Sequence, residues 1–367
     1  MTRIRAPLAV VVRNLRIAGR RADLVVQAVA VPVVVLGLAS IIFGTSDAWP
    51  VGVVDESDTP QSRMVVRALQ DTRGATGPYF RSITDDPEHA ERLLREGRLH
   101  LVVTIPDDFP VHHQIETSTY NINTDAMKNV RLRVTTAANL HDQLTAADGV
   151  TAYLDKARAQ DVSRTAFMGG SAVVLALLLG AALLSANLYA LESEHRTRKE
   201  IALSPLGASQ AATGAALAGW LLSFLAAVPT ALLALAFGTR ATLPDLAQTL
   251  LIVLPAGLVA AGLGVLTAVG LRTHRLIQPT LILLALGSYF AGGGFIPVPA
   301  LPPLARTIAA GWPPSYVFEW ANPVLHGFRD APSAVALAGA GLAAVAALAA
   351  AMGAARRDYR TAAAPGQ

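Results

Sequence analysis

The sequence predicts a polytopic α-helical membrane protein with six transmembrane helices and a small extracytoplasmic α/β domain. Hydrophobic residues make up 53% of the 367 residues and charged residues only 15%, whereas about a quarter of the residues in soluble proteins are charged. Six runs contain no Asp, Glu, Lys or Arg: residues 24–46, 165–191, 201–239, 246–271, 276–305 and 331–355. A helix needs about 20 apolar residues to cross the hydrocarbon core, and the runs lack the alternation of barrel strands.

The first element expected is an amphipathic helix within residues 1–23. Leu8, Val11, Val12 and Leu15 recur at helical spacing, while arginines occupy the other side. Such a helix would lie in the cytoplasmic interface of the bilayer with its arginines reaching water. The alternative is a basic flank that only orients the first span. Residues 24–46 then form the first span, which is too long for a signal peptide and is expected to remain as an anchor.

Residues 47–164 are polar and should form an α/β domain outside the cytoplasm. The segment from Pro50 to Asp55 is expected to be a strand, followed by a helix that Thr59 caps and Pro60 begins. Asp86 and Pro87 start a second helix in the same way, and strands are expected near 80–83, over 99–105 and within 115–122. Helical character dominates from Asp125 to the second span.

Five further spans are expected at about 166–191, 209–238, 246–271, 276–296 and 332–355, with a cytoplasmic tail at 356–367. Basic residues gather beside alternate loops. They are Arg3, Arg5, Arg13, Arg16, Arg20, Arg21, Arg196, Arg198, Lys199, Arg272, Arg275, Arg356, Arg357 and Arg360. Because positive residues of short loops stay in the cytoplasm, both termini are expected there.

The segment 290–314, before the last span, contains three consecutive glycines and several prolines. Such a segment cannot form a continuous helix, and irregular backbone at membrane depth needs protein or water around it. We expect a re-entrant pair of half-helices that acts as an outer gate; an ordinary external loop is the alternative. The gate residues expected are Gly292, Gly293, Gly294, Phe295, Pro297, Pro302 and Pro313.

Several kinds of chemistry find no support in the sequence. There is no Cys, and therefore no disulfide or thiolate metal site. His112 and His113 are adjacent, so they do not share a face of a helix or a strand, and no metal-ligand or catalytic motif occurs. No phosphate loop for a nucleotide is present either. Asn187 and Gln278 are the notable polar residues of the spans, and both lie near span ends.

Together these segments resemble the permease subunit of an ABC-2 type exporter. The segments that carry the resemblance are Val51–Asp55 with its following helix, 96–109, 192–200 with Leu203-Ser204-Pro205, 290–297, and Trp312-Pro313-Pro314. Their order and topology resemble the family over nearly the whole chain. Residues 120–125 depart from its pattern, which leaves the second half of the external domain less defined.

The resemblance implies a transport subunit, not an enzyme, with ATP and Mg²⁺ bound to a separate cytoplasmic ABC ATPase and no cofactor in this chain. A coupling loop at 192–207 would dock on that ATPase; its mixture of acidic and basic residues exceeds what membrane orientation needs, although a purely topological role is the alternative. The coupling residues expected are Glu192, Glu194, Arg196, Arg198, Lys199, Glu200, Leu203 and Pro205.

The resemblance also implies a second permease copy, or a homologous permease, in contact through the first and fifth spans. The complex would lie in the cytoplasmic membrane of a bacterium, among lipids and without nucleic acid. It would export an amphiphilic or lipophilic substrate such as a drug, an antibiotic or a lipid, because the span surfaces are apolar. The rival interpretation is an ATPase-independent receptor, scaffold or envelope-assembly protein that acts through its external domain.

Overall fold

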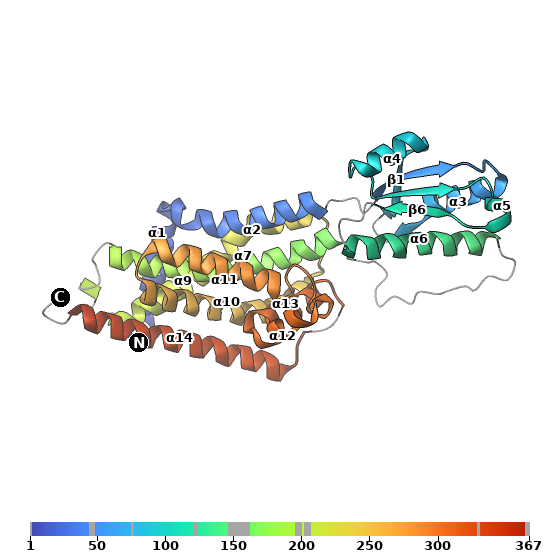
Figure 1. Ribbon diagram of the computed structural model, residues 1–367. Helices are drawn as coiled ribbons and strands as arrows, with labels where there is room; N and C mark the ends of the chain where they lie inside the picture. The colour runs from blue at the N-terminus through green and yellow to red at the C-terminus, as the bar shows by residue number, and fades with distance from the viewer. Residues whose placement is uncertain are drawn as a thin grey trace. The chain divides into compact units, whose positions relative to one another are not determined.

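The computed structural model describes residues 2–43, 48–74, 77–119, 124–145, 162–194, 200–201, 207–328 and 331–363 (Figure 1). The chain forms two compact units. The helical unit comprises Met1–Ile42 and Arg164–Gln367, and the α/β unit comprises Phe43–Ser163. The α/β unit is thus inserted after the first long apolar helix.

The described part of the helical unit contains the following helices. They are α1 (Thr2–Arg20), α2 (Ala22–Phe43), α7 (Arg164–Glu194), α9 (Gly207–Ala236), α10 (Leu243–Leu271), α11 (His274–Ala291), η1 (Val298–Ala300), α12 (Pro303–Gly311), α13 (Pro313–Leu325) and α14 (Ala334–Ala363). Among the described residues, five helices are long and apolar enough to cross a membrane: α2, α7, α9, α10 and α14. The other helix expected to cross, α11, has 18 residues, but it begins with His274 and Arg275 and is less apolar than these five.

Helix α7 forms the centre of the helical unit. Its side chains Leu175, Leu179 and Leu183 are fully buried against neighbouring helices. Small residues bring those helices close: a Cβ on Gly219 of α9 would lie 2.2 Å from Ser185 Oγ, and one on Gly264 of α10 would lie 2.2 Å from the Ala182 carbonyl oxygen. Such close approach matters in lipid, where packing takes the place of the hydrophobic effect between helices.

Helix α1 packs against α9 through a face that differs from the expected one. Val10, Val11, Asn14 and Ala18 are buried, whereas Leu8 is 62% exposed and Val12 is 39% exposed. A Cβ on Gly214 of α9 would lie 2.3 Å from Val10 Cγ1, so only a glycine leaves room for this side of α1 to pack against α9. The helix is confirmed, but the expected apolar stripe is split, and Leu8 and Val12 face outward.

The α/β unit contains a four-stranded sheet in the order β4-β1-β5-β6. The strands are β1 (Trp49–Asp55), β4 (Phe80–Thr84), β5 (Leu101–Ile105) and β6 (Glu116–Thr119), and a short ribbon is formed by β2 (Arg73–Gly74) and β3 (Gly77–Pro78). Strand β1 runs parallel to β4 and β5, and β6 runs antiparallel to β5. The helices are α3 (Pro60–Asp71), α4 (Pro87–Arg95), α5 (Phe109–His112) and α6 (Thr124–Thr145).

Local sequence signals account for these elements. Thr59 forms a capping box with Ser62 at the start of α3, and the Asp86 side chain accepts from the His89 N–H at the start of α4. Successive residues of β1 face opposite sides of the sheet. Val51 and Val53 therefore enter one apolar core, and Val54 enters the other.

Candidate functional site

The last turn of α7, where the expected coupling loop begins, is tied to α1 by an ion pair. The Glu192 side chain is only 10% exposed, and its carboxylate pairs with the Arg13 guanidinium. Arg13 Nη2 also donates to Asn14 Oδ1 at 3.0 Å. A buried carboxylate without a partner would be costly, so this pair fixes the end of α7 to α1.

A second set of contacts joins α7 to α11 and α2. His274 Nδ1, at the start of α11, lies 3.1 Å from Asn187 Oδ1, and its Nε2 lies 3.3 Å from the carboxylate of Glu194. Asn187 Nδ2 in turn donates to the Leu24 carbonyl of α2 at 3.5 Å. Gln27 of α2 donates to Gln278 of α11 at 3.0 Å. Both polar residues that the sequence singled out near span ends, Asn187 and Gln278, thus connect helices.

The C-terminal part of α14 reaches the same region through Asp358, whose side chain is 2% exposed. Tyr189 Oη of α7 donates to Asp358 Oδ2 at 3.4 Å, and Arg272, the C-cap of α10, lies 3.4 Å from Asp358 Oδ1. We call these residues the α7 terminal cluster. They are Arg13, Asn187, Tyr189, Glu192, Glu194, Arg272, His274 and Asp358.

Sequence reasoning did not single out Asp358, Tyr189 or a role for Arg272 and His274 in this cluster. Asp358 follows Arg356 and Arg357, so it resembles one more charge of a cytoplasmic tail. The one sequence feature that could have revealed Asp358 is its acidic charge, because the positive-inside rule accounts only for the basic residues around it. Pairing between distant helices is a tertiary property that local patterns do not reveal.

Three of the eight residues expected in the coupling loop lie within the described chain. Glu192 is buried, Glu194 ends α7, and Glu200 is exposed within a helical turn. The other five, Arg196, Arg198, Lys199, Leu203 and Pro205, lie outside the described residues. The described carboxylates are therefore divided between an inward contact at Glu192 and an exposed position at Glu200.

At the other candidate site the glycines end α11. The Gly292 N–H donates to the Ser288 carbonyl at 2.8 Å, and the N–H groups of Gly294 and Phe295 both donate to the Tyr289 carbonyl, at 3.0 and 3.1 Å. Gly293 has a φ of +94°, and a Cβ there would lie 2.7 Å from Val298 Cγ2. Helix α11 therefore ends at Ala291, before the expected end of the fifth span at about residue 296.

Two short helices follow in place of a continuous span. Pro302 precedes α12, its carbonyl accepts from the Arg306 N–H at 2.9 Å, and Pro313 begins α13; Pro297 is exposed before η1. Helix α12 lies within the expected segment 290–314, whereas α13 begins at its end and continues to Leu325. The tryptophan between the two helices anchors them, because Trp312 Nε1 donates to Ser288 Oγ of α11 at 2.9 Å.

Helix α7 connects these two sites from opposite ends of the helical unit (Figure 1). Near its start, a Cβ on Gly170 would lie 2.7 Å from Leu325 Cδ2 and 3.1 Å from His326 Nε2, just after α13. Gly170 and Glu192 are 22 residues apart, which is about 33 Å along a helix. That length is about the thickness of the hydrocarbon core of a bilayer.

We next consider metal binding and shifted pKa values among the described residues. Within them, no group of three or more His, Asp or Glu side chains is arranged to hold a metal ion. Burial lowers the pKa of His326, and the nearby Asp245 carboxylate opposes that shift. The two sites are thus built from helix ends, ion pairs and aromatic packing.

Comparison with known proteins gives one result for the chain as a whole. A family model described as ABC-2 family transporter protein matches residues 24–356. The match begins in α2, includes the α/β unit, and ends within α14. No curated protein matches the chain.

Proposed function

Because the chain belongs to the ABC-2 family of transporter proteins, as a permease membrane subunit, we propose that it exports a substrate with energy from an ATPase on a separate subunit. The observation that carries the proposal is the α7 terminal cluster. It connects the helix that enters the coupling loop to α1, α11 and α14 at once. A force applied to residues 192–207 would therefore reach several helices.

The number of membrane crossings can be inferred from the helix ends that lie together in the α7 terminal cluster. Glu192 at the end of α7, Asp358 near the end of α14, and Arg13 of α1 belong to one cluster. Helix α11 starts in that cluster at His274 and ends beside Trp312 of the outer segment. We infer that α11 crosses as well, which makes six crossings with both termini on one side. The basic residues of that side support a cytoplasmic location for it.

The outer segment, from Gly292 through α12 and α13, is proposed as the gate. Its helices are short and are held to α11 by a few contacts, among them the Trp312–Ser288 hydrogen bond and the packing of Phe318 on Tyr289, with ring centroids 5.9 Å apart. Tilting α11 against α7 would shift these contacts together. Motion that starts at the coupling loop would thereby open a path at the far end of the bundle.

A second permease copy is proposed to pack against α2 and α11. The Gln27–Gln278 hydrogen bond places these two helices side by side. On the outer face of α11, Leu283 is 74% exposed, and a Cβ on Gly287 would meet no atom within 4 Å. Small and apolar residues on one face allow close helix contact in a membrane. The apolar surface around this contact favours an amphiphilic or lipophilic cargo.

Isolation of the full chain from its native membrane in mild detergent tests this proposal. We expect a phosphate-loop ATPase to accompany it in stoichiometric amount, and to be lost when Arg196, Arg198 and Lys199 are replaced by Ala. The matched control replaces Arg356 and Arg357, two exposed residues of α14, and should retain the ATPase. If the intact membrane yields no ATPase, the proposal fails, and the external domain becomes the functional part of a receptor or scaffold.

A further inference from the structure

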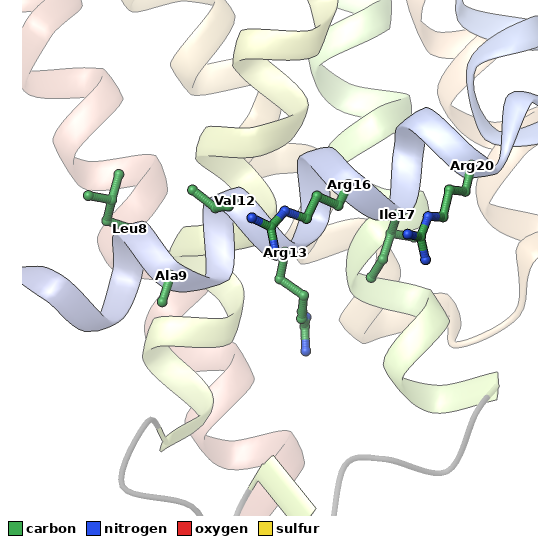
Figure 2. Close-up of a pocket in the computed structure, with 7 residues that line it drawn as sticks. All are labelled: Leu8, Ala9, Val12, Arg13, Arg16, Ile17 and Arg20. Carbon is green, nitrogen blue, oxygen red and sulfur yellow. The ribbon is translucent and has the colours of Figure 1, made fainter.

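The outward face of α1 forms an open groove in which arginines alternate with apolar side chains (Figure 2). Its volume is about 670 Å³, and its main lining residues are Leu8, Val12, Arg13, Arg16, Ile17 and Arg20. Helix α1 crosses the neighbouring helices of the bundle here (Figure 2), and the residues that line the groove all belong to α1. The groove thus offers positive charge and apolar surface within one short stretch of chain.

The positive charge of the groove is only partly neutralised. Helix α1 contains no acidic residue. Within the part of the chain that the structure describes, Arg16 and Arg20 have no ion-pair partner, and Arg13 Nε is buried without a hydrogen-bond partner. Arg13 Nη2 donates to the Glu192 carboxylate. A ligand with several acceptor oxygens would satisfy donors that the protein leaves unused.

We propose that this groove binds an anionic glycerophospholipid of the cytoplasmic leaflet. A guanidinium donates two parallel hydrogen bonds to phosphate oxygens, and Arg16 and Arg20 lie four residues apart on one face of α1. The exposed Leu8 and Val12 would contact the acyl chains, a surface that a soluble phosphate would leave uncovered. The choice of leaflet rests on the proposed function, whereas the chemistry of the groove does not.

Binding at this site would be linked to the α7 terminal cluster through Arg13. The lipid phosphate and the Glu192 carboxylate would compete for the same guanidinium. Removing the carboxylate should therefore strengthen lipid binding, and by reciprocity the lipid should weaken the hold of α1 on the end of α7. Anionic lipid would then set how firmly the coupling loop is connected to the bundle.

The test uses the full chain in phosphatidylcholine nanodiscs and measures its affinity for a fluorescent phosphatidylglycerol. The double variant Arg16→Gln/Arg20→Gln should weaken binding about 30-fold, since each basic residue near anionic lipid contributes to affinity separately. The matched control Arg356→Gln/Arg357→Gln removes the same amount of charge from the end of α14, next to Asp358 of the α7 terminal cluster. It should bind like the wild type. Both double variants are checked for an unchanged helical circular dichroism spectrum.

A second readout does not depend on the arginine variants. Glu192→Gln should bind phosphatidylglycerol more tightly than Glu194→Gln, because only Glu192 pairs with Arg13. An equal loss in both double arginine variants would show general surface attraction and overturn the proposal. So would displacement by glycerol phosphate or inorganic phosphate as effective as displacement by the lipid, or equal affinity in the two glutamate variants. If the wild-type chain binds no phosphatidylglycerol but retains its ATPase partner, the groove alone is rejected. If it binds phosphatidylglycerol but has no ATPase partner, the proposed function alone is rejected.

Discussion

Arg13 and Glu192 lie 179 positions apart in the chain, yet they form an ion pair between α1 and the last turn of α7. The carboxylate is largely buried and the guanidinium is partly exposed. Helix α1 is thereby attached to the point where the expected coupling loop leaves the bundle. In the proposed mechanism this contact carries motion from the loop to the N-terminal helix.

Breaking this ion pair should detach α1 from the end of α7 while lowering the stability of the protein only slightly. Glu192→Gln is expected to lower the free energy of unfolding by about 1 kcal/mol, since water screens the exposed side of Arg13. The difference in ATP turnover between the ATPase with the permease and the ATPase alone should become smaller. The double variant Arg13→Glu/Glu192→Arg should restore both properties. If the reversed pair is no better than Glu192→Gln alone, the interaction between the two residues is not the cause.

The close contact between α7 and α10 should make Gly264 intolerant of a side chain. A Cβ there would lie 2.2 Å from the Ala182 carbonyl oxygen, so Gly264→Ala should cost about 1–3 kcal/mol as α10 moves outward. Gly270, on the same helix, has no atom within 4 Å of a Cβ, and Gly270→Ala should be neutral or slightly stabilising. Thermal unfolding in detergent compares the two. Equal effects of both variants would contradict the packing described for this interface.

The turn that ends α11 should require glycine at position 293. Gly293→Ala places a side chain at a φ of +94° and against Val298, at a cost of about 1–3 kcal/mol. Gly311→Ala, at the end of α12, meets no atom within 4 Å and is the matched control. With the gate distorted, export by vesicles should fall while ATPase binding persists. Unchanged export in the Gly293 variant would remove this turn from the gate.

The pH dependence of stability should reveal His326. Its pKa in the folded protein is below the ordinary value of 6.5 because burial disfavours the charged ring. Well above pH 6.5 the ring is neutral in both states, and as the pH falls through 6.5 the unfolded chain binds a proton that the folded chain does not. Stability is therefore lost on acidification.

Unfolding measured at pH 7 and pH 5 compares the wild type with His326→Gln. The variant should lose less stability over this range, because the titrating ring is absent. The control His112→Gln, an exposed residue of the α/β unit, should behave like the wild type. An acid loss in His326→Gln as large as in the wild type would assign the pH dependence to other groups.

The sequence predicted the elements better than their contacts. The caps at Thr59 and Asp86 depend on local chemistry, and both are confirmed. The strand expected over 99–105 is found at Leu101–Ile105, and the helix expected to end at about 296 ends at Ala291, where the glycines begin. For α1 the helix was predicted, but the buried face was not, because Gly214 of α9 decides which side fits. Helix α11 shows the limit of composition, since its polar first turn lies in the terminal cluster, where His274 has partners.

For the candidate sites, too, local features were predicted from the sequence and contacts between helices were not. The glycines and prolines of the outer segment predict its irregular backbone by themselves, although nothing local shows that α13 continues to Leu325. Glu192 was expected on the ATPase-facing surface, and its burial against Arg13 instead turns it toward the bundle. Asp358 was missed because its partners, Tyr189 and Arg272, come from two other helices.

The central claim is that a separate ATPase docks where α7 leaves the bundle, and a single-cysteine cross-link tests it most directly. The chain has no cysteine of its own, so Glu200→Cys provides one reactive thiol at an exposed position of the loop. Glu88→Cys, exposed on α4 of the α/β unit, is the control. With a bifunctional thiol reagent in native membranes, we expect Glu200→Cys to be joined to a phosphate-loop ATPase and Glu88→Cys not to be. No ATPase adduct at position 200, or an equal yield at position 88, would contradict the account.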